Sequence, residues 1–370
     1  MIRAPACETD RGGSPREDSL AYPERPCRRT PVSIGLAVVG VFATFGATAG
    51  GSLEVRGVLD AGINRAWGDV DWAGYAPADE QYRRKGQFQS RLTIRANEDF
   101  GLGWHVGVTL EQGFNGQTGL TDCSADGAPC GVDSWWNRAR LIEARHHAYG
   151  RLRIGRQAAL GQEPMDIAHP WAGETVATDD GAALLAWRCD RAQQELDPAN
   201  PSACVAGSGQ RRGQSVRYDL PQVAGWKVGF QHGLKPDPTH LTVRVSYQQG
   251  GIAVSAAIVK TSQSTQVYPL AAVASLGGVR LHAGHTWGKG AVRSRSYSFV
   301  GASAPVGRGE LRAGLARYRD GSEGNHDKLA LGWHRPLGHR VVAYADVALA
   351  KFYKTGHRGG GLDAGLRVSF

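Results

Sequence analysis

Apolar and polar side chains alternate at every second position through most of the chain after Gly50, in stretches of 8–12 residues. The first stretch places Leu53, Val55 and Leu59 on one face and charged residues such as Glu54 on the other. Gly, Pro, Asn and Asp punctuate the stretches, as they do at turns. A period of two is that of a β-strand, and helical periodicity is missing from this part of the sequence. The sequence therefore predicts an all-β fold.

The links between the stretches are short and long in turn. Seven short links, such as Asp99–Gly103, alternate with eight longer and more polar ones, such as Arg65–Gly86. They join sixteen strands and put both ends of the folded chain on the side of the short turns. This is the plan of an outer-membrane β-barrel, in which about ten residues per tilted strand cross the hydrocarbon layer. We expect a 16-stranded antiparallel transmembrane β-barrel with short periplasmic turns.

The last stretch of the chain separates this barrel from a soluble β-sandwich, which would also alternate. Leu362, Leu366, Val368 and Phe370 share one face, and the chain stops on the aromatic residue. A soluble domain gains nothing from an exposed terminal Phe, whereas a membrane barrel can place it in an interfacial aromatic girdle. The mean hydropathy of −0.34 excludes a helical membrane protein but not a barrel, whose two faces average out.

The first 49 residues read as a leader. An apolar stretch over 31–49 follows Arg28 and Arg29 and ends in the small-residue site Ala47-Thr48-Ala49. This order is typical of a secretory signal peptide, with a membrane anchor as the alternative. We therefore predict a signal peptide over residues 1–49 and a barrel over residues 50–370. The long polar stretch before Arg28 leaves the true start codon open.

The charge and the cysteines of the chain further narrow the classes of protein to which it can belong. Without residues 1–49 the chain keeps 37 Lys/Arg and 29 Asp/Glu, a net charge of +8, dispersed without the single basic run of a nucleic-acid-binding protein. The four remaining cysteines form two close pairs, Cys123 with Cys130 and Cys189 with Cys204. An even number in an exported chain favours two disulfides, and the spacing argues against the alternative, a zinc site. We expect no metal and no cofactor.

Five segments spread over residues 50–370 resemble the general diffusion porins of Gram-negative outer membranes, in the branch common in beta-proteobacteria. They are SLEVRGVLDAGI (52–63), SRLTIRANEDFGLGWHVGVTLEQGF (90–114), YGRLRIGRQ (149–157), QSVRYDLPQVAGWKVGFQHG (214–233) and GLRVSF (365–370). The resemblance implies a homotrimer of sixteen-stranded barrels in the outer membrane, each with a water-filled pore for small hydrophilic solutes and ions.

The resemblance also implies roles for individual segments. The third extracellular loop, Ala158–Gln214, is expected to fold inward and narrow the pore, and the second, Asn115–Asn137, to latch onto a neighbouring subunit. Outer-membrane lipid and lipopolysaccharide surround such a barrel. We also expect the barrel-assembly machinery to recognise the C-terminal strand that ends at Phe370.

A diffusion pore needs a polar constriction with an electric field across it rather than a catalyst. Alternation places six arginines on the lumen face as candidates for the constriction wall, and the inward loop supplies five facing carboxylates. The wall candidates are Arg56, Arg91, Arg95, Arg153, Arg217 and Arg244, and the loop candidates are Glu163, Asp166, Glu174, Asp179 and Asp180. The arginine excess motivates the hypothesis of an anion preference.

Three alternatives remain open. A substrate-selective porin for a sugar, phosphate or carboxylate is favoured by the long third loop, and a closed structural barrel would conduct nothing. An outer-membrane enzyme needs a nucleophile beside a base, and the sequence has no G-x-S-x-G, H-E-x-x-H or phosphate-binding glycine loop. We therefore predict that the protein is not an enzyme.

Overall fold

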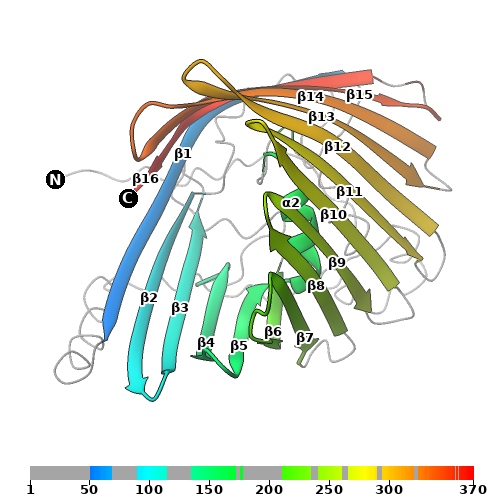
Figure 1. Ribbon diagram of the computed structural model, residues 1–370. Coiled ribbons are helices and arrows are strands. Elements are labelled where there is room, and N and C mark those ends of the chain that lie inside the picture. Colours follow the sequence, from blue (N-terminus) through cyan, green and yellow to red (C-terminus); the bar gives the residue numbers. More distant parts are fainter. Residues whose placement is uncertain are drawn as a thin grey trace, which may run out of the picture. The chain divides into compact units, whose positions relative to one another are not determined.

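Sixteen antiparallel strands form one closed barrel in the computed structural model of the chain (Figure 1). The structure describes residues 51–68, 90–114, 135–171, 176–177, 211–234, 241–260, 266–289, 294–320, 324–354, 356 and 358–370. No helix among these described residues is long and apolar enough to cross a membrane.

The strands are β1 (Ser52–Gly68), β2 (Ser90–Gly101), β3 (Trp104–Phe114), β4 (Ala139–His146), β5 (Gly150–Ala158), β6 (Arg211–Asp219), β7 (Trp226–Gly233), β8 (Leu241–Gln249), β9 (Ile252–Lys260), β10 (Gln266–Leu276), β11 (Val279–Lys289), β12 (Ser294–Val306), β13 (Gly309–Asp320), β14 (Gly324–Pro336), β15 (Val341–Phe352) and β16 (Arg358–Ser369). Between β5 and β6 the chain forms a 3-10 turn, η1 (Leu160–Gln162), and a short helix, α2 (Glu163–Ala168). The predicted fold and strand number are confirmed. The short turns lie at or next to the short glycine-containing links that the sequence predicted, such as Asp99–Gly103.

Closure depends on the pairing of the first strand with the last. In the β1–β16 ladder Leu59 lies opposite Val368 and Ile63 opposite Ala364, so the apolar faces of the two strands coincide. Gly57 and Phe370 exchange backbone hydrogen bonds of 2.8 and 3.0 Å, and the Phe370 ring lies over Gly57. The terminal aromatic residue therefore completes the outer face at the seam, where a Cβ on Gly57 would meet its ring.

The two faces of the barrel wall differ in chemistry. Large apolar side chains are exposed on the outside, for example Leu53, Ile142, Leu315 and Leu349, while the charged positions between them point to the lumen. A water-soluble protein would bury such rows of Leu, Ile and Val. An apolar outside with a polar inside is the arrangement of a barrel solvated by lipid.

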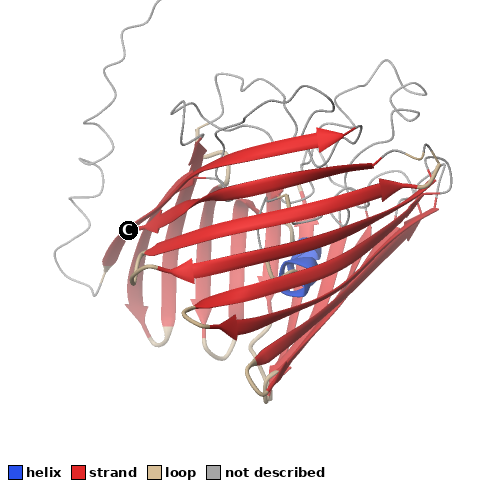
Figure 2. Ribbon diagram, turned by 90° about the horizontal axis from the view of Figure 1, so that it is seen from above, coloured by secondary structure: helices blue, strands red, loops and turns tan. Residues whose placement is uncertain are grey.

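The largest buried apolar cluster is inside the barrel, where α2 and the residues after it pack on the inner wall (Figure 2). Met165, Ala168, Trp171 and Val176 contribute to this cluster from the segment between β5 and β6. Small residues on the wall make the space: a Cβ on Gly314 would lie 2.8 Å from the Trp171 ring. The described residues between β5 and β6, which belong to the link predicted as the third extracellular loop, therefore lie inside the barrel.

Candidate functional site

The inward segment, defined here as residues 159–171 and 176–177, is hydrogen-bonded to the wall at several successive points. Leu160 N donates to Gln231 on β7 (2.7 Å), and the Thr286 hydroxyl on β11 donates to the Met165 sulfur (3.0 Å). His169 shares a 2.8 Å hydrogen bond with the Tyr297 hydroxyl on β12. Such spaced anchors fix the path of the segment across the lumen.

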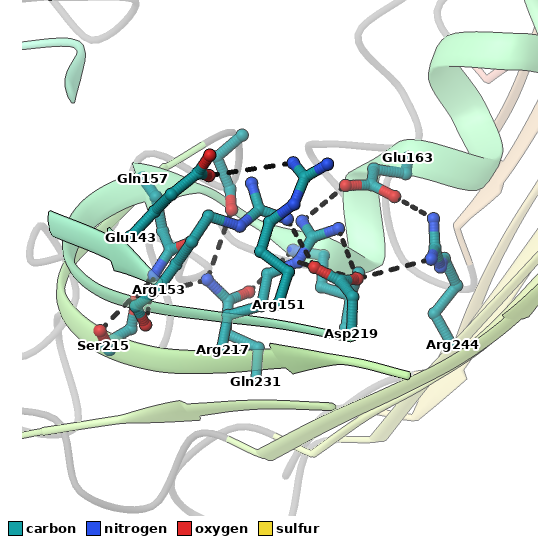
Figure 3. Close-up of polar contacts among 12 residues, drawn as sticks. Glu143, Arg151, Arg153, Gln157, Glu163, Ser215, Arg217, Asp219, Gln231 and Arg244 are labelled. Carbon is teal, nitrogen blue, oxygen red and sulfur yellow. Dashed lines mark hydrogen bonds and ion pairs between the residues drawn. The ribbon is translucent and has the colours of Figure 1, made fainter. Parts of the chain in front are cut away.

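Glu163, at the start of α2, lies at the centre of an ionic cluster with four wall residues (Figure 3). Its two carboxylate oxygens accept hydrogen bonds from Arg217 on β6 and Arg244 on β8. Asp219 on β6 accepts from Arg153 at 2.5 Å and from Arg217 at 2.9 Å, and lies 3.5 Å from Arg244. Three guanidinium groups thus share two carboxylates, which gives the cluster a net positive charge.

Strand alternation explains how these residues meet. Arg217 and Asp219 are two positions apart on β6 and therefore share the lumen face. Arg153 on β5 lies directly opposite Arg217 in the ladder, a pairing of like charges that would repel without Asp219 between them. The side chain of Arg217 is only 4% exposed, so its charge depends on these partners rather than on water.

An uncharged network supports the ionic cluster on the β5–β7 wall. The Gln157 amide donates to the Ser215 hydroxyl (3.2 Å), and the Gln231 amide donates to the same hydroxyl (3.2 Å) and to the Ala158 carbonyl (3.2 Å). Gln231 also accepts the Leu160 N–H, so it links the wall to the first turn of the inward segment. Gln231 is buried and engaged at both ends of its amide, which holds the local geometry tightly.

The far end of the inward segment is fixed by two buried carboxylates on adjacent strands. The Trp171 indole donates to Asp346 on β15 at 2.8 Å, and His334 on β14 donates to the same oxygen at 3.0 Å. Val176 N donates to Asp363 on β16 at 2.6 Å, and Asp346 lies opposite Asp363 in the ladder. The described residues of the inward segment therefore contact the wall at positions from β7 to β16.

A second set of cations faces the lumen on β2, β4 and β5, and we call Arg91, Arg95, Arg145 and Arg151 the arginine wall. Arg145 lies opposite Arg151 in the ladder. The nearest carboxylate to Arg151 is Glu143 at 3.8 Å, too far for a hydrogen bond. Arg91, Arg95 and Arg145 make no hydrogen bond or ion pair with any described residue.

The structure does not bring all the predicted site residues together. The structure brings Glu163 together with Arg153, Arg217 and Arg244, whereas Arg91 and Arg95 belong to the arginine wall. Arg56 instead pairs with Glu54 on its own strand. Asp166 is on α2 but exposed, 3.4 Å from the Gln162 amide. Several predicted positions lie outside the described residues, namely the loop carboxylates Glu174, Asp179 and Asp180, the cysteines Cys123, Cys130, Cys189 and Cys204, and the leader over residues 1–49.

The predicted site residues did not include three carboxylates on the wall itself, Asp219, Asp346 and Asp363. Each occupies a lumen position among small or polar residues, so alternation indicates its face but not its partner. A usable signal was the run of glycines and alanines at lumen positions of β11–β16, such as Gly284, Gly314 and Gly332, which marks where a segment packs inside. Among the described residues no group of three or more His, Cys, Asp or Glu side chains is arranged to hold a metal ion.

A closed barrel with a lipid-solvated outside, a charged lumen and a segment folded into that lumen defines a pore-forming outer-membrane protein. The model of the Gram-negative porin family matches residues 35–355, so the chain belongs to that family and lies in the outer membrane. Porins are channels for passive diffusion of small hydrophilic solutes and ions, and this is the general function of the chain.

Comparison with known proteins agrees with the family. The chain is 25% identical over 348 residues to outer membrane porin protein 32 of Delftia acidovorans, covering 86% of this chain and 88% of that protein. Among solved structures it resembles an anion-selective porin from Comamonas acidovorans, with a TM-score of 0.69, 20% identity and coverage of 86% of this chain and 100% of the other. The OmpT protein of Vibrio cholerae, lacking its eighth loop, matches with a TM-score of 0.60, 12% identity and coverage of 86% and 99%.

Proposed function

We propose that this porin prefers anions, and that the arginine wall sets the preference while the ionic cluster around Glu163 holds the constriction in place. One observation carries the proposal: Glu163, one of the five loop carboxylates expected to face the pore arginines, is bound to Arg217 and Arg244. Among the described residues, the arginine wall supplies cations for a passing ion, and three of its members, Arg91, Arg95 and Arg145, make no hydrogen bond or ion pair. In a narrow passage with low-dielectric walls, their field is screened less than on an open surface.

The composition and one relative support the same direction. The chain carries a net charge of +9, and the ionic cluster has three arginines for two acids. The structurally similar porin from Comamonas acidovorans is described as anion-selective. The wall residues predicted from the sequence, Arg56, Arg153, Arg217 and Arg244 included, remain candidates for lining the constriction together with Glu163 and Asp166.

Planar-bilayer recording tests this proposal. The zero-current potential in a KCl gradient is expected to show chloride more permeant than potassium, and the double variant Arg91→Gln/Arg95→Gln to reduce that preference. Arg335→Gln, which removes a cation at an outward-facing position of β14, is the control and is expected to leave the potential unchanged. A potassium-selective wild-type current would refute the anion preference without affecting the family assignment.

The same recordings distinguish general diffusion from a solute-specific pore. Guanidinium groups bind carboxylate and phosphate oxygens in a bidentate manner, so the arginine wall suits oxyanions as well as chloride. Conductance limited only by solute size supports general diffusion. Saturable block by one class of solute, such as a phosphate or a carboxylate, would instead support a substrate-selective porin.

Assembly and export belong to the same proposal. We infer a signal peptide over residues 1–49, a homotrimer, and recognition of the closing strand by the barrel-assembly machinery; one matching Vibrio cholerae OmpT structure is described as a trimer form. We further propose that the protein has no enzymatic activity. N-terminal sequencing of the exported protein tests the leader, and its molar mass in mild detergent tests the trimer.

A further inference from the structure

Four neighbouring strands carry a row of charged side chains on the outer face of the barrel. Arg317 on β13 lies opposite Asp327 on β14, Asp327 opposite Lys351 on β15, and Lys351 opposite Arg358 on β16. The four residues form one continuous line across the strands, near the strand ends that lead into the longer, extracellular links. The next outward position on β13 beyond Arg317 is another cation, Arg319.

The rows beneath this line show that it faces the membrane. Leu315, Leu329 and Leu349 form the adjacent row, each about half exposed on the outside of the barrel. The row below that contains Leu331, Val347 and Leu362. The outer surface therefore changes within two residues from lipid-facing leucines to charges, as it does where hydrocarbon meets headgroups.

The charges of the row are held in an ordered arrangement. Asp327 binds Arg317 in a bidentate pair, with Nε–Oδ1 and Nη2–Oδ2 distances of 2.6 Å, and accepts the Tyr353 hydroxyl at 2.9 Å. This hydrogen bond to the Asp327 carboxylate raises the pKa of the Tyr353 phenol above its ordinary value. Lys351 lies over the Tyr353 ring, 4.9 Å from its centre, rather than on the carboxylate.

The charged row and its neighbour Arg319 contain more cations than carboxylates. Asp327 is matched by Arg317, while Lys351, Arg358 and Arg319 have no carboxylate partner among the described residues. Like charges placed side by side repel, and cations at the edge of a hydrocarbon layer are costly without a counter-charge. Adjacent strands are about 4.8 Å apart, so Lys351 and Arg358 can both reach one anionic group.

From this geometry we propose that the row Arg317–Asp327–Lys351–Arg358 is a binding site for a phosphorylated lipid headgroup of the outer leaflet. The acyl chains of that lipid would lie on the leucine rows, and Lys351 and Arg358 would contact its phosphate. A lipid is favoured over a free phosphate because the apolar rows continue directly from the charged row on the same face. Basic residues at a membrane surface attract anionic lipid.

The test uses the full-length barrel, folded in a mild uncharged detergent, with diphosphoryl lipid A as the probe. We expect the double variant Lys351→Gln/Arg358→Gln to bind lipid A roughly thirtyfold more weakly than the wild type in native mass spectrometry or a titration. Arg335→Gln is the matched control, since it removes a cation from an outward-facing position near the opposite end of β14, and is expected to retain wild-type affinity. Circular dichroism and heat-dependent gel mobility establish that each variant is folded.

Three outcomes would overturn the site. They are an unchanged lipid A affinity in the folded double variant, an equal loss in Arg335→Gln, and equal binding of dephosphorylated lipid A by the wild type. Inorganic phosphate serves as a second probe. If millimolar phosphate displaces lipid A completely and binds as tightly by itself, the site recognises a free anion rather than a lipid. None of these outcomes depends on the ion selectivity of the pore.

Discussion

Two sectors of the lumen wall hold their arginines in opposite ways. On β6 and β8, Arg217 and Arg244 are nearly inaccessible to water and bound to Glu163 of the inward segment. On β2 and β4, Arg95 and Arg145 are exposed and have no hydrogen-bond partner among the described residues. We propose two roles for one residue type: an arginine that is bound to a carboxylate holds the inward segment in place, and an arginine without such a partner exerts its field on passing ions.

The physical reason lies in burial. A buried guanidinium without a partner costs several kcal/mol, so Arg217 is tied to the presence of Glu163 and Asp219. An exposed arginine keeps its hydration and needs no partner, so its neighbours are free to vary. Substitutions in the first sector should therefore affect stability, and substitutions in the second should affect selectivity.

The largest effect is expected from Glu163→Gln. The change leaves the buried Arg217 and Arg244 with one carboxylate, Asp219, between them and should destabilise the barrel by about 3 kcal/mol. Heat unfolding of the refolded protein in detergent, followed by circular dichroism, measures it. Asp166→Asn removes an exposed acid from the same helix and should cost less than about 1 kcal/mol. Equal losses in the two variants would mean that the ionic cluster does not hold the segment.

Trp171→Phe should have the next largest effect. The ring is buried against Gly314 and Gly332, and the substitution removes the indole N–H that Asp346 accepts. Loss of one donor to a buried carboxylate should cost about 1–3 kcal/mol, in the same unfolding measurement. Trp135→Phe, at an exposed ring, is the control. A stability equal to that of the control would show that this end of the segment is not anchored through the indole.

The sequence predicts those features of the two sectors that depend on residues close together in the chain, and not those that depend on contacts between distant residues. The alternation of Leu362, Leu366 and Val368 with Asp363 and Arg367 indicates which side chains face lipid, because a strand has only two faces. The same reasoning finds sixteen strands, because each turn interrupts the pattern locally. The closed ladder confirms the strand number, and the exposed Leu362 and Leu366 beside the buried Asp363 confirm the faces.

Partner choice within the lumen is not local. Trp171 and Asp346 are 175 positions apart, and alternation indicates only that Asp346 faces inward. Which of the many inward carboxylates meets Glu163, Trp171 or an arginine depends on the path of the inward segment across the barrel. The glycines at positions 314 and 332 carry part of that information, since a small lumen residue leaves space for a large one.

A pair of single substitutions contrasts the sectors directly. Arg95→Gln should lower the chloride-to-potassium permeability ratio by about twofold to threefold, because it removes an exposed pore charge, and should leave stability within about 0.5 kcal/mol. Arg217→Gln should lower stability more than Arg95→Gln does, and should change the permeability ratio less. Zero-current potentials and unfolding curves on the same preparations measure both. A larger selectivity change in Arg217→Gln than in Arg95→Gln would reverse the roles assigned to the sectors.

The smallest effect concerns salt, and it separates the sectors without mutation. The Debye length falls from about 10 Å at 0.1 M to about 3 Å at 1 M ionic strength, so exposed charges lose most of their reach while buried pairs are screened little. Between these concentrations at a constant tenfold gradient, the anion preference should fall by roughly half. The unfolding midpoint, which depends on the bonds of Arg217 and Arg244, should change little over the same range. A preference that persists at high salt would mean that ions pass close to the buried cluster, and would assign the selectivity to Arg217 and Arg244 instead.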